Sequence, residues 1–276
     1  MTYKSIITTL DPTSSVEHSL IAAAAVARRF GGHLSVRAVA FEASIPIAAS
    51  GHVSAEVVVT LNAHAKEQAA RLADAAERRL QTEGCLYDVA ELLCVSELLE
   101  ARFGALARFY DLAVLCAPTE SLLEGPAPRL AEGPLFVGGA PLLLMNSRRP
   151  APRAARVVIA WNDSQEALRA VRAALPYLAE AEQVSVISFD PGETEQHSSN
   201  DLARMLTRHG AAVDVLSVPL AGASVADALR RIVAEIGADL VVMGAYGHSR
   251  LREFVFGGVT REVLATPPDA ALMMSR

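Results

Sequence analysis

The chain has few aromatic residues, few cysteines and no long apolar run, and each shortage excludes a class of protein. Aromatic residues make up 5% of its 276 residues, too few for the base-stacking surfaces of single-strand nucleic-acid binders. The longest apolar run, residues 20–27, is much shorter than the roughly 20 residues that cross a bilayer. The sequence therefore predicts neither a nucleic-acid partner nor a membrane partner.

An excess of positive charge is also missing. The chain has 25 Lys and Arg against 31 Asp and Glu, a formal net charge of −6, and so lacks the basic footprint of a general nucleic-acid binder. Its three cysteines, Cys85, Cys94 and Cys116, form neither an even disulfide set nor a metal-type spacing. Because the start of the chain also lacks a signal-peptide pattern, we expect a protein of the reducing cytoplasm.

What the chain does have is 51% apolar residues and length for about two domains. An internal repeat divides it. Residues 4–11 and 156–163 are similar apolar runs, each ending at a turn and each followed by an Ala-rich helical segment. A second pair of runs follows at 33–41 and 183–189. The repeat predicts two copies of one structural unit.

Each unit alternates strands with helices and closes with a short apolar strand, at 141–145 and 270–274. The fourth run of each unit is apolar throughout, which is typical of strands buried on both faces of a parallel sheet. The predicted fold class is therefore α/β, with two doubly wound parallel-sheet domains in tandem, at residues 1–147 and 148–276. The first unit is longer between its second and third strands, by about one helical segment.

The two closing strands are predicted to lie at sheet edges, where an unpaired strand invites pairing. They can pair within one chain as an intramolecular pseudo-dimer, or between chains as a homodimer. The helix starts are predicted from capping residues. These are Ser14 with Glu17, Asp163 with Glu166, Ser96 and Ser224.

Ligands of open parallel sheets bind beyond the carboxyl ends of the strands, near the point where the strand order reverses. In the second unit these positions are Asn162, Asp163 and Ser164 after the first strand, and a glycine-rich segment after the fourth. Glycines bring backbone N–H groups close to a ligand, and a helix N-terminus attracts phosphate. The candidate binding residues of that segment are Gly244, Gly247, His248, Ser249, Arg250, Gly257, Gly258, Val259 and Thr260. The competing interpretation is that these glycines serve only a tight turn and helix packing.

The pattern resembles the nucleotide-binding form of the universal stress protein family, which carries Gly-x2-Gly-x9-Gly-Ser/Thr after the fourth strand. Gly244, Gly247 and Gly257 match that spacing. Gly258 stands where the family has Ser or Thr, and Asn162 stands where it has an acidic residue. Over the whole chain the resemblance is to a tandem member of the family. It implies the adenine nucleotide alpha hydrolase-like fold and binding of ATP or another adenine nucleotide, accompanied by Mg²⁺, in the second domain only.

The first unit departs further from this pattern. Cys116 and Thr119 stand where the second unit has Gly244 and Gly247, and the pair Gly138–Gly139 lies too far along the chain. We therefore expect the first domain to be degenerate and structural. Two roles stay open for it: shaping the dimer, or holding an unrelated ligand in its longer segment Glu42–Leu61. Cys116 is interpreted as a buried, unreactive thiol rather than a nucleophile.

No catalytic constellation and no metal-ligand pattern is predicted, so the sequence favours a stress-response regulator over a fast enzyme. The nucleotide state would be read by a protein partner that the sequence does not identify. Two alternatives stay open. One is a nucleotide-independent scaffold or dimerisation protein, and the other is a weak ATPase in which Asp163 orients water. Trp161, at the mouth of the predicted site, is interpreted as a packing residue.

Overall fold

The computed structural model describes residues 2–12, 16–44, 54–117, 126–146, 151–245 and 258–276. The first half contains β1 (Ser5–Leu10), α1 (Val16–Phe30), β2 (His33–Phe41), α2 (Ala55–Leu80), β3 (Leu86–Cys94), a 3-10 turn η2 (Ser96–Leu98), α3 (Leu99–Ala107), β4 (Leu112–Ala117), α4 (Ala127–Glu132), a π-helical turn η3 (Gly133–Gly138) and β5 (Leu142–Asn146). The second half contains β6 (Arg156–Ala160), α5 (Gln165–Leu178), β7 (Gln183–Phe189), α6 (Glu193–Arg208), β8 (Val213–Val218), α7 (Val225–Ile236), β9 (Leu240–Gly244), α8 (Gly258–Ala265) and β10 (Ala271–Ser275).

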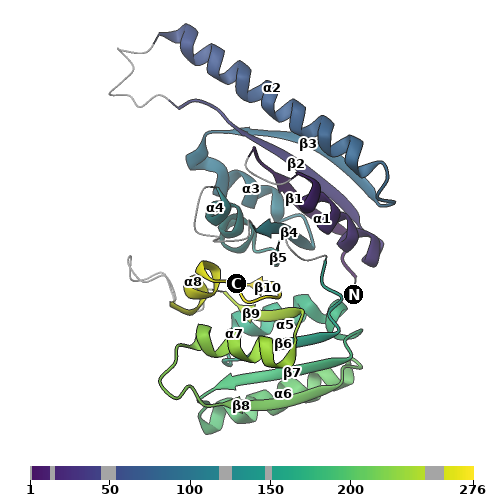
Figure 1. Cartoon of the computed structure of the whole chain (residues 1–276), viewed down its shortest axis with the longest axis vertical. Helices are drawn as coiled ribbons and strands as arrows, with labels where there is room; N and C mark the ends of the chain where they lie inside the picture. Colours follow the sequence, from purple (N-terminus) through teal and green to yellow (C-terminus); the bar gives the residue numbers. More distant parts are fainter. Residues whose placement is uncertain (1, 13–15, 45–53, 118–125, 147–150, 246–257) are drawn as a thin grey trace.

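The ten strands of the described residues form one sheet in the order β3-β2-β1-β4-β5-β10-β9-β6-β7-β8. Within each half the strands are parallel, and the halves join where β5 and β10 pair antiparallel, with Leu272 opposite Leu144. Figure 1 shows the two halves one above the other with β5 and β10 between them. The predicted fold class is confirmed, and the two closing strands pair within one chain.

The helices cover both faces of this sheet, and each face has a core that runs through both halves. One core holds buried residues of α1, α2, α5 and α6, together with Leu143 of β5 and Met273 of β10. The other holds residues of α3, η3, α7 and α8, together with Leu142 and Leu272. Because adjacent residues of β5 and β10 point to opposite faces, the central strand pair contributes to both cores.

The repeat is visible in side-chain contacts as well as in topology. The Asp111 carboxylate accepts hydrogen bonds from the backbone N–H groups of Lys4 and Ser5, at 2.7 and 2.9 Å. Asp239 accepts in the same way from Ala155 and Arg156, both at 3.3 Å. In each half the aspartate before the fourth strand thus fixes the start of the first strand.

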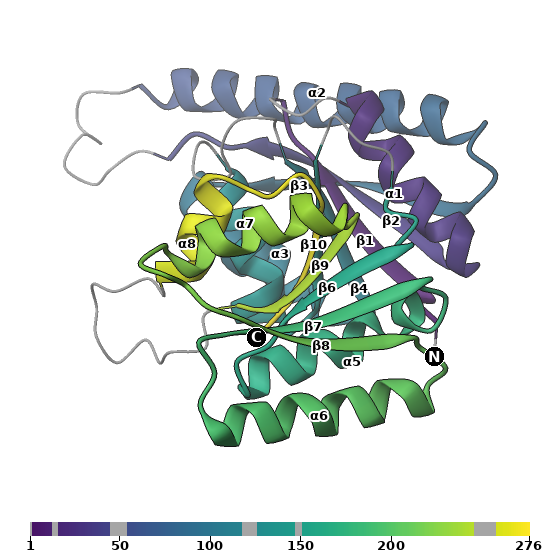
Figure 2. The ribbon, with the colours of Figure 1, turned by 60° about the horizontal axis from the view of Figure 1, so that its bottom comes forward.

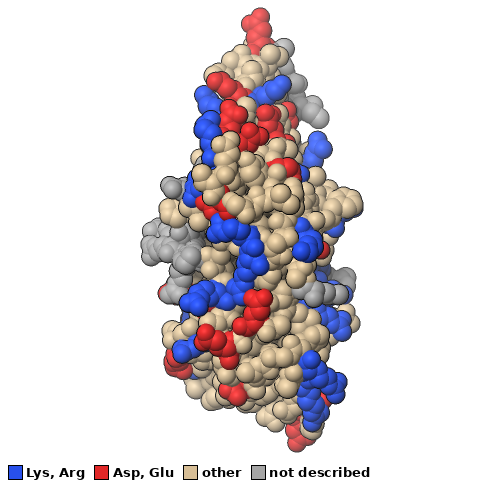
Figure 3. Space-filling model, turned by 90° about the vertical axis from the view of Figure 1, so that its right-hand side faces the viewer, with Lys and Arg blue, Asp and Glu red and all other residues tan. Residues whose placement is uncertain are grey.

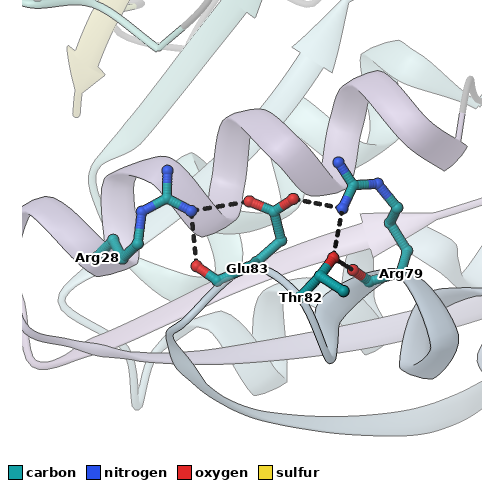
Figure 4. Close-up of polar contacts among 4 residues, drawn as sticks. All are labelled: Arg28, Arg79, Thr82 and Glu83. Carbon is teal, nitrogen blue, oxygen red and sulfur yellow. Dashed lines mark hydrogen bonds and ion pairs between the residues drawn. The ribbon is translucent and has the colours of Figure 1, made fainter.

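On the face of α1 and α2, one buried carboxylate ties the two helices of the first half together. Arg28 of α1 donates to the Glu83 Oε2 at 2.8 Å and to the Glu83 backbone oxygen at 2.6 Å. Arg79 of α2 pairs with the other oxygen of the same carboxylate. Figure 4 shows Glu83 between the two guanidinium groups.

At the junction of the halves, Arg29 of α1 reaches into the second half. Its guanidinium pairs with Glu180 at 2.8 Å and donates to the backbone oxygens of Pro152 and Arg153, each at 2.9 Å. It also lies 4.7 Å from the centre of the Tyr177 ring, a cation–π distance. Figure 3 shows one side of the molecule, and Lys and Arg side chains gather there at about half its height.

Several sequence predictions need correction. α5 is capped by Ser164 and not by Asp163, since the Ser164 Oγ accepts from the Ala167 N–H at 3.1 Å. Ser224 caps α7 as predicted, but Ser96 opens a 3-10 turn and its Oγ accepts from Arg129. About half of the additional length of the first half lies in α2, of 26 residues against 16 in α6, and the rest lies before it, between β2 and α2. Ser14 lies outside the described residues.

Candidate functional site

The strand order of the second half reverses between β6 and β9, and a cleft of about 360 Å³ opens there at the carboxyl ends of the strands. Its size falls within the usual range of small-molecule sites. The cleft is lined by Ala160, Trp161, Asn162, Asp163, Ser164, Phe189, Glu195, Val225, Met243, Gly244, Gly258, Val259 and Thr260. The structure thus brings together seven of the twelve predicted site residues.

The other five predicted residues, Gly247, His248, Ser249, Arg250 and Gly257, lie outside the described residues. The predictions made for them therefore stay predictions. They belong to the segment 246–257 that joins β9 to α8. Gly244, two residues before that segment, and Gly258, directly after it, both line the cleft.

After β6 the chain makes a tight turn that is held by its own side chains. The Asn162 Oδ1 accepts from the Ser164 hydroxyl at 2.7 Å, and Ser164 in turn caps α5. Asp163 between them has a φ of 54°, in the left-handed region that Asn and Asp tolerate better than most residues. The amide of Asn162 is therefore engaged in the turn, and the carboxylate at this edge is that of Asp163.

The two described glycines of the motif have different surroundings. A Cβ on Gly244 would lie 2.6 Å from the Ala167 nitrogen in the first turn of α5, so helix packing alone requires glycine there. Among the described residues, a Cβ on Gly258 would meet nothing closer than the Glu262 Oε1 at 3.8 Å. No described residue therefore crowds Gly258 where α8 begins.

Trp161 closes one side of the cleft. Its side chain is 6% exposed, and its indole N–H donates to the Ser198 Oγ of α6 at 2.8 Å. It packs in the core formed with α5 and α6. Trp161 is thus a packing residue that also fixes α6 against the end of β6.

Sequence reasoning missed Phe189, Glu195, Val225 and Met243 as lining residues. Phe189 ends β7 at the carboxyl edge, so the rule that located Asn162 could have found it. Glu195 lies on α6, and only the packing of that helix brings it to the cleft. Burial and the nearby charge of Asp163 raise the pKa of the Glu195 carboxyl above its ordinary value.

The charge of the described cleft is negative, since Asp163 and Glu195 line it without a Lys or Arg among the described lining residues. The described residues also contain no cluster of three or more His, Cys, Asp or Glu that could hold a metal ion. The described cleft therefore has the N-terminus of α8, apolar side chains such as Phe189 and Met243, and two carboxylates. Such a set can bind and orient an anionic ligand that carries its own cation.

The corresponding edge of the first half is built differently. Cys116 lies near the end of β4, with its thiol facing the His18 backbone oxygen at 4.0 Å. Burial raises the pKa of the Cys116 thiol to about 11, so the thiol is protonated at neutral pH and a poor nucleophile. Thr119 lies outside the described residues.

Three glycines of the first half, Gly104, Gly133 and Gly138, serve the packing of α3 on η3. A Cβ on Gly104 would lie 2.4 Å from the Gly133 backbone oxygen, and one on Gly138 would lie 2.9 Å from the Gly104 oxygen. Gly139 has a φ of 64° and ends η3 in the left-handed conformation. Gly138 and Gly139 therefore end a helical segment, whereas Gly258 begins one.

The fold and the cleft define a doubly wound α/β protein with a cleft at its strand-order reversal. Residues 154–269 match the model of the Universal stress protein family, so the second half is a domain of that family. No curated protein matches the chain.

Solved structures extend the likeness to the whole chain. A universal stress protein from Archaeoglobus fulgidus DSM 4304 is 14% identical with a TM-score of 0.74, covering 98% of this chain and 98% of its own. A putative universal stress protein from Pseudomonas aeruginosa UCBPP-PA14 is 16% identical with a TM-score of 0.62, covering 99% of this chain and 93% of its own. At these identities the likeness concerns the fold, and it includes the tandem arrangement of the two halves. Among the described residues no helix is long and apolar enough to cross a membrane.

Proposed function

We propose that the protein is a cytoplasmic stress-response regulator whose second half binds an adenine nucleotide in the cleft between β6 and β9. ATP is the first candidate for this nucleotide. The observation that carries this proposal is the N-terminus of α8 at that cleft, where none of the described residues fills the space beside Gly258. The positive end of a helix with free N–H groups is a common phosphate site. Family membership of residues 154–269 supports the same function.

The shape of the cleft suits such a ligand in one orientation. Apolar side chains of Phe189, Val225 and Met243 line it and can cover a base, while Gly258 and Thr260 lie at the start of α8. Because Asp163 and Glu195 are both acidic, a triphosphate without a cation would be repelled. We therefore propose that the nucleotide enters as its Mg²⁺ complex and that a protein partner responds to the occupied cleft.

A nucleotide-independent scaffold is the second candidate function, because the packing of Gly244 against α5 explains one motif glycine without any ligand. A weak ATPase is the third, with Asp163 as the residue that orients water. Binding of ATP separates the first two candidates, and release of phosphate above that of a buffer blank identifies the third.

Two opposite substitutions at one position test the proposal. Gly258→Ser adds the hydroxyl that the family pattern has there, in space that accommodates it, and should tighten Mg·ATP binding about fivefold through one more hydrogen bond. Gly258→Asp places a carboxylate at the same point and should weaken binding at least about tenfold.

The control is Gly192→Asp, which adds the same charge at the N-cap of α6, where a Cβ meets nothing within 4 Å. It should leave ATP affinity within about twofold in isothermal titration calorimetry. If all three variants bind ATP as the parent does, the phosphate is not at α8. If neither the parent nor Gly258→Ser binds ATP, the scaffold function replaces the proposal.

A further inference from the structure

Outside the cleft, a groove of about 320 Å³ separates two helices of the second half. α1 packs against α2 in the first half, but the equivalent helices α5 and α6 do not pack closely on each other along their described residues. Figure 2 shows α5 and α6 beside each other on one face of the sheet. In the first half Glu83 joins α1 to α2, whereas in the second half a groove lies between the equivalent helices α5 and α6.

The floor and walls of the groove are mostly apolar. Trp161, Leu168, Leu202 and Met205 line it, and Leu202 is 4% exposed. Gln165, Ser164 and Ser198 add polar groups near the end that adjoins the nucleotide cleft. Trp161, Asp163 and Ser164 line both spaces, so the groove and the cleft are neighbours.

The charges at the rim are unequal. Asp201 on α6 is paired with Arg204 at 2.6 Å. Arg172 on α5 is exposed, lines the groove, and makes no hydrogen bond or ion pair with another described residue. Asp163 also lines the groove, but it precedes the start of α5, whereas Arg172 lies two turns into that helix. An apolar groove with the unpaired guanidinium of Arg172 at this far end is complementary to a ligand with an apolar body and an anionic end.

We propose that the α5–α6 groove binds a small hydrophobic carboxylate. The apolar part lies against Leu168, Leu202 and Met205, and the carboxylate pairs with Arg172. This site is distinct from the nucleotide cleft and does not depend on nucleotide binding. The indole of Trp161 lines it, so occupancy is reported by the single tryptophan of the chain.

The test uses 4-phenylbutyrate as the probe on the full chain, followed by Trp161 fluorescence and by isothermal titration calorimetry. A ligand of this size should bind with a Kd of about 0.1–1 mM. The neutral analogue 4-phenylbutan-1-ol should bind about tenfold more weakly, because it cannot pair with Arg172.

Two substitutions locate the site. Arg172→Gln should weaken 4-phenylbutyrate binding about tenfold. Met205→Glu, on the half-buried wall of α6, should abolish it by bringing a like charge into the groove. Arg169→Gln is the matched control, since Arg169 lies one turn earlier on α5, is exposed and does not line the groove. It should stay within about twofold of the parent.

Three results would overturn the proposal. One is the absence of a saturable signal up to about 10 mM, ten times the expected upper limit. Another is equal binding of the carboxylate and the alcohol. The third is loss of binding in Gly258→Asp with full binding in Arg172→Gln, which would show that the probe occupies the nucleotide cleft instead.

Discussion

The two halves share one topology but use glycine for different purposes. In the first half, Gly104, Gly133 and Gly138 let the backbones of α3 and η3 approach each other. In the second half, Gly258 lines a cleft, and no described atom lies closer than 3.8 Å to the position its Cβ would take. These glycines of the first half thus serve helix packing, whereas in the second half Gly258 stands where we propose a phosphate.

The same contrast appears between the helices. α1 and α2 are held together by Glu83 between Arg28 and Arg79, whereas α5 and α6 leave a groove. The helices α1 and α2 of the first half are therefore in contact, whereas the equivalent helices of the second half are separated by a groove. On this account the first half mainly supports the sheet and the second half holds the ligands.

The largest effect is expected at the seam that joins the halves. Leu272→Lys places a charge at a residue that is 1% exposed and paired with Leu144, and should lower the free energy of unfolding by about 3–5 kcal/mol in urea titrations. Leu86→Lys is the control, because Leu86 is 73% exposed on the edge strand β3, and should change stability by less than about 0.5 kcal/mol. Equal unfolding midpoints for Leu272→Lys and the parent would show that the seam does not hold the halves together.

The next effect concerns the packing glycines of the first half. Gly104→Ala should lower the free energy of unfolding by about 2 kcal/mol, because the clash with the Gly133 oxygen outweighs the gain of about 1 kcal/mol in helix propensity. ATP affinity should stay within about twofold. Gly192→Ser, in open space at a helix N-cap, is the control and should change stability by about 0.5 kcal/mol or less. A stabilised Gly104→Ala would mean that α3 and η3 are not in contact.

A smaller loss is expected at the junction on the side of α1 and α5. Arg29→Met removes the ion pair with Glu180, two hydrogen bonds to backbone oxygens and the contact with the Tyr177 ring. We expect a loss of about 1–2 kcal/mol in chemical denaturation. Arg71→Met breaks an exposed pair with Glu67 on α2 and should cost less than about 0.5 kcal/mol. Similar losses for both variants would remove Arg29 from the contacts that join the halves.

The smallest effect is a pH dependence in the cleft. The raised pKa of Glu195 means that its ionisation opposes folding, so this contribution to stability is present below the ordinary value of 4.5 and is lost as pH rises through the raised pKa. Glu195→Gln should remove that decline. The resulting change in the free energy of unfolding should be less than about 1 kcal/mol, because solvent screens the site. Thermal unfolding between pH 4 and 7 measures it, with Glu193→Gln on the same turn of α6 as the control. A parent and a Glu195→Gln protein with parallel pH profiles would contradict the assignment.

Much of the fold could be predicted because the strands are continuous apolar runs with recognisable turns. The second strands of both halves, His33–Phe41 and Gln183–Phe189, match the predicted ranges. The first strands end earlier than predicted, at Leu10 and Ala160. Apolar patterning does not fix where backbone pairing ends, so these boundaries are the least predictable part of the fold.

Local capping was harder to predict because several polar residues compete for one helix end. Ser164 caps α5 because Asp163 adopts a positive φ and turns the chain. Ser96 bonds Arg129 instead of capping α3, a contact set by tertiary packing across 33 positions of the chain. Glu195 and the groove residues of α6 were missed for the same reason. Only the packing of α6 on the sheet brings these residues to the cleft and the groove.

The central claim is that one half of this duplicated protein binds the nucleotide and the other does not. Equilibrium dialysis of the full chain against Mg·ATP, with protein concentration fixed by amino-acid analysis, measures the binding stoichiometry directly. The account predicts one nucleotide per chain in the parent and in Gly104→Ala, and a loss of binding in Gly258→Asp. Two nucleotides per chain, or one that Gly258→Asp leaves in place, would contradict it.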